Sequence, residues 1–183
     1  MTTTSDTDLS KFMSYILRHA PEELGLALDD AGWTDYDVFS QRVCERIGVT
    51  DDDIIRVIST NSKKRFTLDG SRIRAAQGHS VGVDLAAQVA AATDVLYHGT
   101  TAEAWASIQT AGLKPMDRTH VHLSADLETA RQVAGRRKGP HVLLMVPARQ
   151  MEAKGYSFLR ADNGVWLTAN VPADFLSIVS EIA

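Results

Sequence analysis

Apolar residues near the start of the chain recur with the period of a helix. They follow an i, i+3, i+4, i+7, i+8 spacing, which predicts an amphipathic helix. These positions are Leu9, Phe12, Met13, Ile16 and Leu17. Pro21 is expected to end the helix, because the residue before a proline is pushed out of helical geometry. Arg18 and His19 are therefore expected on its last turn.

Two more helices and a hairpin are expected after this helix. Apolar positions predict helices over 38–47 and 51–58, the second of them capped by the aspartates at 51–53. The period then changes to two over 65–68 and 72–74, with a turn at Asp69-Gly70, which predicts a β-hairpin. Three helices and a hairpin form the order of a winged helix. Three aspartates at the start of the third helix would repel phosphates, which argues against ordinary reading of DNA by that helix.

The second half of the chain alternates short apolar runs with short helical patterns. Strands are expected over 95–98, 121–124, 141–146 and 165–168, and helices over 102–111 and 127–133. This order predicts an α+β fold, with a small mixed or antiparallel sheet in the second lobe. Neither GxGxxG after a strand nor GxxxxGK[ST] occurs, so Rossmann and P-loop folds are poorly supported. We place the lobe boundary between residues 88 and 89, giving lobes 1–88 and 89–183.

Positive charge is concentrated in two short segments of a protein that is acidic as a whole. The 183 residues carry a net charge of −4, yet six basic residues lie within 56–74 and four within 131–138. This distribution indicates a focused anion site, although two solvated basic turns would give the same counts. No apolar run approaches the ~20 residues that span a membrane. The start of the chain lacks the pattern of a signal peptide, so we expect a cytoplasmic protein.

The candidate residues each have a plain structural interpretation beside the functional one. Arg18 and His19 could stabilise a helix end by charge, or could clamp a phosphate with a bidentate fork and a second donor. His98, at a strand end before Gly99, could be a hydrogen-bonded core histidine or a ligand contact. His120 and His122 suggest zinc, but the chain has no HExxH, no CxxC and one cysteine, so we expect no metal site.

Taken together, six segments resemble one family. They run from Leu17-Arg18-His19 through 64–66, 73–80, 96–100 and 121–124 to 163–168, the last two reading VHLS and NGVWLT. The set resembles the RNA 2′-phosphotransferase family, whose eukaryotic members finish tRNA splicing. The resemblance covers the chain from about Leu9 to Phe175. It implies an N-terminal winged-helix lobe that binds RNA and a C-terminal lobe of the ADP-ribosyltransferase fold that binds NAD.

The resemblance also implies the site residues. An essential Arg-His-Arg-Arg set corresponds to Arg18, His19, Arg65 and Arg136, with Arg137 as the alternative for the last position. The ADP-ribosyltransferase signature corresponds to His98, His122 and Val165. Where some relatives carry a glutamate at the third position, Val165 cannot act as a base, which suits an acceptor that is already an anion. The implied NAD contacts are Tyr97, His98, Gly99, Thr100, His122, Leu123, Ser124 and Val165.

The implied reaction moves an internal RNA 2′-phosphate onto the ADP-ribose part of NAD in two steps, through RNA-2′-phospho-ADP-ribose. NAD is consumed as a co-substrate, the partners are NAD and 2′-phosphorylated RNA, and we expect a monomer that needs no metal. Two alternatives stay open at this point. One is a transferase that leaves ADP-ribose on terminal phosphates of RNA or DNA, or on a protein side chain. The other is a winged-helix regulator with a ligand-sensing lobe, which the acidic third helix disfavours.

Overall fold

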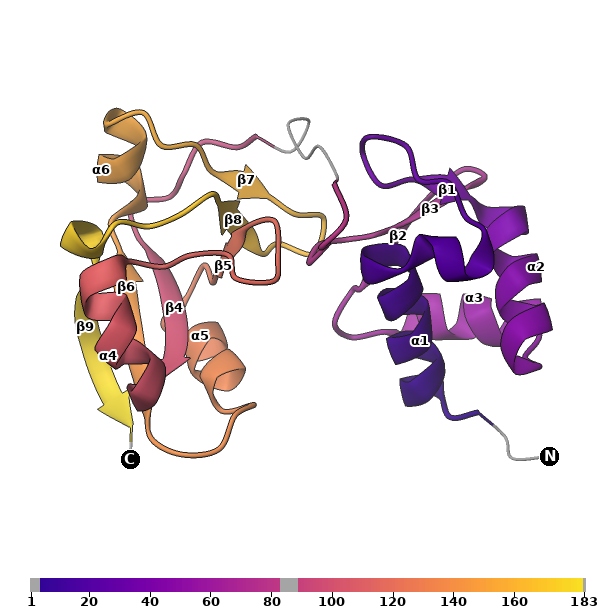
Figure 1. The fold of residues 1–183 in the computed structure, drawn as a ribbon, viewed down its shortest axis with the longest axis horizontal. Helices are drawn as coiled ribbons and strands as arrows, with labels where there is room; N and C mark the ends of the chain where they lie inside the picture. Colours follow the sequence, from indigo (N-terminus) through magenta and orange to yellow (C-terminus); the bar gives the residue numbers. More distant parts are fainter. Residues whose placement is uncertain (1–3, 83–88, 183) are drawn as a thin grey trace. The chain divides into compact units, whose positions relative to one another are not determined.

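The computed structural model describes residues 4–82 and 89–182 (Figure 1). Contacts within the chain define two units, Met1–Ala87 (unit 1) and Gln88–Ala183 (unit 2), and each is described by itself. The boundary expected after residue 88 adjoins residues 83–88, which lie outside the described part. Across the described residues the protein is a mixed α+β protein with six α-helices and small antiparallel sheets.

Unit 1 contains three α-helices followed by a hairpin. The helices are α1 (Asp6–His19), α2 (Tyr36–Ile47) and α3 (Asp51–Thr60), with a short 3₁₀ helix, η1 (Pro21–Leu24), after the first. The strands β1 (Thr34–Asp35), β2 (Phe66–Asp69) and β3 (Arg72–Ala75) form an antiparallel sheet in the order β1-β3-β2. The expected helices and hairpin are confirmed. The turn itself lies one residue later than expected, because Asp69 still pairs with Arg72 as the last strand residue.

Side-chain caps explain where these helices begin. The Ser5 side chain caps α1 by accepting a hydrogen bond from the backbone of Asp8. Thr50 and Asp53 form a capping box at the start of α3, and hydrogen bonds from the Thr50 backbone and hydroxyl help to hold the pKa of Asp53 at about 2. The first turn of α3 is therefore acidic for a structural reason, since carboxylates there satisfy free backbone N–H groups and oppose the helix dipole.

One apolar face of α1 packs into the core of unit 1. Its members are Leu9, Met13, Ile16 and Leu17, and they meet Phe39, Val43, Ile54, Val57, Phe66 and Ile73 from the other elements. This arrangement confirms the amphipathic pattern of the sequence. It also leaves Ser10, Ser14 and Arg18, spaced four residues apart, on a single stripe of the same helix.

Unit 2 contains two three-stranded antiparallel sheets and three α-helices among its described residues. The strands are β4 (Leu96–Thr101), β5 (Val121–Leu123), β6 (His141–Val146), β7 (Leu159–Arg160), β8 (Trp166–Thr168) and β9 (Ser177–Ile182). They pair in the orders β4-β6-β9 and β5-β8-β7. The helices are α4 (Ala102–Ala111), α5 (Leu127–Ala134) and α6 (Ala148–Ala153), with a 3₁₀ helix, η3 (Ala173–Phe175).

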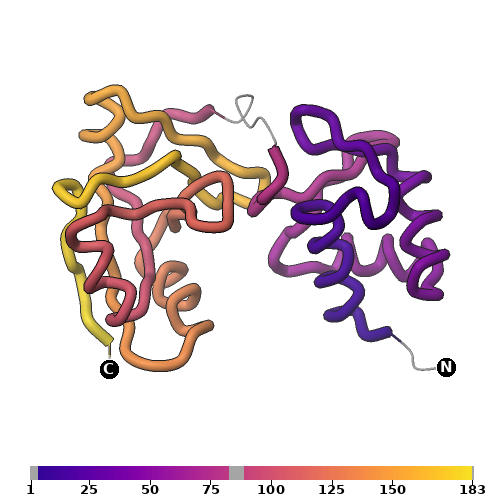
Figure 2. The backbone as a smooth tube through the Cα atoms, in the orientation of Figure 1, coloured from indigo at the N-terminus to yellow at the C-terminus, as the bar shows by residue number. Residues whose placement is uncertain are grey.

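The expected bounds of α4 and β6 are confirmed, and β4 is longer than expected. The sequence interpretation missed α6, β7 and the C-terminal strand β9. In Figure 2 the yellow C-terminal segment runs beside the orange segment that contains β6. Strand β6 is thus the centre of its sheet, with β4 on one side and β9 on the other.

A glycine allows α5 to lie directly on strand β4. A Cβ atom at Gly99 would overlap the carbonyl oxygen of Ala130 and the Cβ of Ala134, both on α5. The two alanines are themselves buried against Leu143 of the neighbouring strand. Close packing of a helix on a strand therefore requires glycine here, independently of any ligand.

Replacing Gly99 with alanine is expected to destabilise unit 2 by about 2 kcal/mol, because the added methyl group must displace helix backbone in a packed interior. Chemical denaturation of wild type and variant measures this change. Gly135→Ala is the matched control, since a Cβ there meets only ordinary contacts, the nearest at 3.5 Å from the Arg131 carbonyl oxygen. Equal destabilisation by the two substitutions would contradict the packing explanation.

Candidate functional site

Two candidate residues lie on the last turn of α1. Arg18 is half-buried and His19 is exposed. The carbonyl oxygen of Arg18 accepts hydrogen bonds from the backbone N–H groups of Ser80 (3.0 Å) and Val81 (3.4 Å). The loop after the hairpin is therefore attached to the helix end that carries both candidates.

The same loop contacts the imidazole of His19. Its Nδ1 lies 2.8 Å from Ser80 Oγ, although the two residues are 61 positions apart. This hydrogen bond orients the ring. Ser80 belongs to one of the segments that carry the family resemblance, but its contact with His19 was not expected from the sequence.

A buried histidine, His79, lies in the same loop. It is 1% exposed, and burial, followed by the charges of Arg18, Arg74 and His19, lowers the pKa of His79 to about 4. Neither ring nitrogen has a hydrogen-bond partner among the described residues. His79 is therefore neutral at pH 7 and adds no charge to the cations around it.

The lowered pKa of His79 predicts that unit 1 loses stability in mild acid. Between pH 6.5 and 4 the unfolded chain takes up a proton at this histidine and the folded chain does not. Folding stability is therefore complete above about pH 6.5 and falls by up to about 3 kcal/mol towards pH 4. Denaturation of wild type and His79→Gln across this range measures the effect, and the variant is expected to lose that part of the slope. An unchanged slope would contradict the assignment.

The third candidate, Arg65, is also attached to α1. Arg65 Nη1 donates a hydrogen bond to Ser10 Oγ at 3.0 Å. The Arg65 backbone carbonyl accepts a hydrogen bond from Ala76 N–H (2.9 Å), which extends the β2–β3 pairing by one residue. The adjacent Phe66 side chain packs into the core. Arg65 is thus tied to the helix that carries Arg18 and His19, although it lies far from both in the sequence.

In unit 2 the structure brings together the two segments expected to bind NAD. Tyr97 and Ser124 pair through two backbone hydrogen bonds, Tyr97 N–H to Ser124 O (2.9 Å) and Ser124 N–H to Tyr97 O (2.8 Å). His98 Nδ1 lies 2.9 Å from the carbonyl oxygen of His122. Four of the expected residues therefore form one connected group where β4 meets β5.

The hydrogen bonds of His98 and His122 define which ring nitrogens carry protons. A carbonyl oxygen only accepts, so His98 Nδ1 is protonated and its Nε2 is an acceptor. Burial lowers the pKa of His98, the hydrogen bond to the His122 carbonyl partly opposes this shift, and the charge of Arg137 adds to the lowering, so the ring is neutral. Arg118 Nη1 lies 2.6 Å from His122 Nδ1. Because a guanidinium only donates, His122 Nδ1 accepts and its Nε2–H is the donor.

The other expected NAD residues are Gly99, Thr100, Leu123 and Val165. The Cα atom of Gly99 lies against helix α5. The side chains of Thr100 and Leu123 are buried. Val165 immediately precedes Trp166, which pairs with Leu123 across the β5–β8 ladder. Val165 is therefore close in the fold to the β5 segment.

Arg118 is a site residue that the sequence interpretation missed. It lies in the loop before β5, and besides contacting His122 its pKa is lowered by burial and by the charges of Arg137 and Arg136. Three arginines therefore share one region of unit 2. The only signal in the sequence was the position of Arg118 four residues before His122, which no periodic pattern marks in a loop.

Within 4–82 and 89–182, no helix combines the length and the apolar character needed to cross a bilayer. In the same ranges no three histidine, cysteine, aspartate or glutamate side chains are grouped so that they could hold a metal ion.

The sequence of the chain matches those of known proteins over nearly all of its length. A family model described as RNA 2′-phosphotransferase, Tpt1/KptA family, matches residues 4–170. A protein of Rhizobium rhizogenes named "Probable RNA 2′-phosphotransferase" is 58% identical over 174 residues, covering 95% of this chain and 94% of its own. Proteins of the same name from Burkholderia pseudomallei (47% identical, 93% and 94% covered) and Streptomyces coelicolor (44%, 92% of both) are also similar. On this match over nearly its whole length, the chain belongs to the RNA 2′-phosphotransferase family.

Proposed function

We propose that the protein is an NAD-dependent transferase that removes an internal 2′-phosphate from RNA and places it on the ADP-ribose part of NAD. The observation that carries this proposal is the attachment of Arg18, His19 and Arg65 to a single helix of a family member. Two arginine forks and an imidazole suit a phosphate dianion, since charge-assisted and bidentate hydrogen bonds bind it most strongly. We expect the protein to act as a cytoplasmic monomer.

Each unit has its own role in this proposal. Unit 1 acts as a winged-helix lobe that binds RNA, supported by its order of three helices and a hairpin. Unit 2 acts as an ADP-ribosyltransferase-like lobe that binds NAD, supported by the group of Tyr97, His98, His122 and Ser124. In this scheme Arg18, His19 and Arg65 hold the RNA 2′-phosphate.

In the first step, an oxygen of the 2′-phosphate attacks the anomeric carbon of the nicotinamide ribose. A phosphate–carbon ester bond forms, the bond from carbon to the nicotinamide nitrogen breaks, and nicotinamide leaves with that electron pair. The phosphate is already an anion, so no base is needed to activate it. This step depends on holding two substrates in the reacting geometry, which can supply much of such a barrier.

In the second step, the ribose 2″-hydroxyl attacks the same phosphorus. A new P–O bond forms, the bond to the RNA 2′-oxygen breaks, and the hydroxyl proton ends on that oxygen. The products are 2′-OH RNA and ADP-ribose 1″,2″-cyclic phosphate. Charge on the non-bridging oxygens must be stabilised here, which arginine donors do well. We assign this role to Arg18, Arg65 and Arg136, and proton transfer at a ribose hydroxyl to His19.

The tautomers in unit 2 indicate how NAD is held. His98 Nε2 can accept a hydrogen bond from a ribose hydroxyl, whereas His122 Nε2–H can donate one to an oxygen of NAD. Ser124, paired with Tyr97, lies on the same ribose and nicotinamide side, and Gly99 and Thr100 lie beside the adenosine diphosphate portion. The scheme routes no step through a metal ion.

The proposal is tested with a short RNA that carries one internal 2′-phosphate, incubated with the protein with and without NAD. Mass analysis of RNA and small molecules is expected to show loss of the phosphate and appearance of ADP-ribose cyclic phosphate only with NAD. An RNA that gains and retains ADP-ribose would instead support ADP-ribosylation of phosphates. A terminally phosphorylated RNA is incubated in parallel to test for that reaction. No change in either substrate would overturn the proposal.

A further inference from the structure

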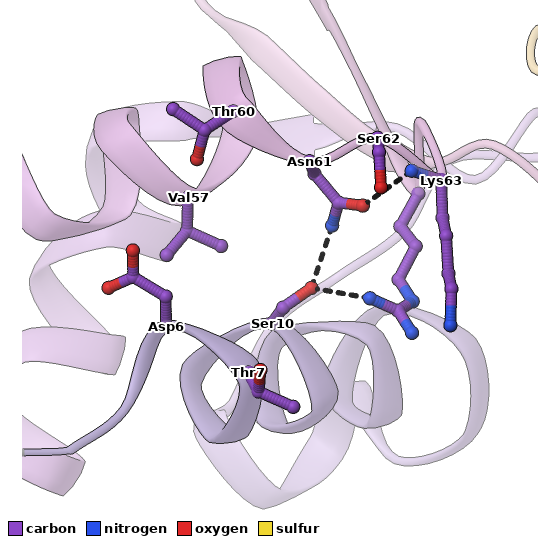
Figure 3. Close-up of a pocket in the computed structure, with 9 residues that line it drawn as sticks. Asp6, Thr7, Ser10, Val57, Thr60, Asn61, Ser62 and Lys63 are labelled. Carbon is purple, nitrogen blue, oxygen red and sulfur yellow. Dashed lines mark hydrogen bonds between the residues drawn. The ribbon is translucent and has the colours of Figure 1, made fainter.

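Ser10 is a buried serine on α1 that receives two hydrogen bonds. Its hydroxyl oxygen accepts from Arg65 Nη1 at 3.0 Å and from Asn61 Nδ2 at 2.7 Å, and Ser10 is only 4% exposed. In Figure 3 Ser10 and Asn61 face one another from α1 and from the end of α3. A single oxygen therefore joins α1, the residue that ends α3 and the arginine that opens the hairpin.

Asn61 is itself held in place. Its side-chain oxygen accepts a hydrogen bond from Lys63 N–H (3.0 Å), and its backbone carbonyl accepts one from Lys64 N–H (2.9 Å). The amide therefore has little freedom to leave Ser10. Because Arg65 follows directly after this turn, the same bonds that shape the turn also limit where the arginine side chain can lie.

A cavity of about 240 Å³ borders this group of residues. Several polar side chains that line the cavity already have partners within the protein. Asn61 bonds to Ser10, Thr60 Oγ1 to the Arg56 carbonyl (2.7 Å), and the Asp6 carboxylate to Arg56 (2.8 Å). Of these bonds, the one between Asn61 and Ser10 supports Arg65, because Arg65 donates to the same Ser10 oxygen.

The position of Ser10 relative to Arg18 gives this support a functional meaning. The two residues lie eight positions apart on one face of α1, about 12 Å along the helix axis. A hydrogen bond at Ser10 therefore keeps the Arg65 guanidinium on the face of α1 that carries Arg18, instead of leaving a flexible side chain in solvent.

We propose that Ser10, supported by Asn61, is a positioning residue that orients Arg65 for phosphoryl transfer, an inference that rests on the function proposed above. Ser10 acts only through Arg65 and does not itself touch the phosphate. Its loss leaves the arginine charge present but no longer oriented. The second step, which relies most on oriented arginine donors, is the step that slows.

The test measures both steps under single-turnover conditions for wild type, Ser10→Ala and Thr7→Val. Ser10→Ala is expected to slow the second step roughly 10- to 100-fold, the loss of one hydrogen bond to a charged group, and to accumulate RNA-2′-phospho-ADP-ribose. Thr7→Val is the matched control, because it removes a hydroxyl from the same cavity and helix. It is expected to react at about the wild-type rate, and melting curves check that all three proteins are folded.

A double-mutant cycle separates positioning from a general loss of structure. In an Arg65→Ala background, Ser10→Ala is expected to cause no further slowing, since the residue through which it acts is gone. Additive effects of the two substitutions, or equal rates for Ser10→Ala and Thr7→Val, would overturn the inference. If wild type itself fails to remove the 2′-phosphate, the proposed function fails; if wild type is active and the cycle is additive, only the role of Ser10 fails.

Discussion

Replacing Arg65 with alanine is expected to lower the rate of 2′-phosphate removal about 10³-fold or more, as losing an arginine that stabilises a phosphoryl-transfer transition state does. The substitution removes the guanidinium that Ser10 holds on α1. Because the developing charge is greatest in the second step, RNA-2′-phospho-ADP-ribose should accumulate. Arg65→Lys keeps the charge but loses the planar fork, so we expect it to restore only part of the rate.

Rapid quenching of reactions with labelled RNA gives the rate of each step. Arg42→Ala is the matched control in unit 1, because Arg42 is an exposed arginine of α2 whose ion pair with Glu45 is on the surface. It should react at about the wild-type rate, since exposed ion pairs contribute little. An Arg65→Ala enzyme as fast as the Arg42→Ala enzyme would show that Arg65 does not hold the phosphate.

The second large effect concerns the two arginines after α5. We expect Arg136→Ala to slow the second step about 10³-fold, again as for an arginine that stabilises phosphoryl transfer, and Arg137→Ala to slow it far less. The resemblance in the segment from Val133 to Arg136 favours Arg136. However, the charge of Arg137 is the one that contributes to lowering the pKa of His98. Removing Arg137 should therefore raise the pKa of His98, while burial continues to hold it below the ordinary value.

The two variants are compared in the same single-turnover assay, with Arg131→Ala as control for loss of an exposed arginine from α5. A pH titration of the His98 ring by NMR reads out the electrostatic effect separately. If Arg137→Ala, and not Arg136→Ala, stops the second step, the fourth phosphate-binding residue is Arg137 and the alignment on Val133 is wrong.

Helices and strands whose apolar residues recur at a regular spacing could be predicted from the sequence. The apolar stripe of α1, the alternation in the hairpin and the run from His141 to Val146 were all found because burial of one face imposes a regular spacing. Helix α6 has six residues, too few to display a stripe, and only Ala148 and Met151 of them are buried. Strand β9 could not be found locally, since its partner β6 lies more than thirty residues earlier in the chain.

The candidate site was predicted in its parts and not in its connections. The sequence motifs identified His19, Arg65, His98 and His122 as candidates, but they did not indicate which residues hydrogen-bond to them. Contacts such as Ser10 with Arg65, 55 positions apart, depend on how α1 packs beside the hairpin, and no local pattern encodes that. The same holds for Arg118, whose role comes from the approach of its loop to His122.

The most direct test of the account follows the phosphorus atom itself. An RNA with a radioactive label in its internal 2′-phosphate is incubated with the protein and NAD, and the labelled products are separated. The account predicts that the label passes to ADP-ribose 1″,2″-cyclic phosphate, with one nicotinamide released for each phosphate removed and no reaction without NAD. Release of the label as inorganic phosphate, or removal that does not need NAD, would contradict it.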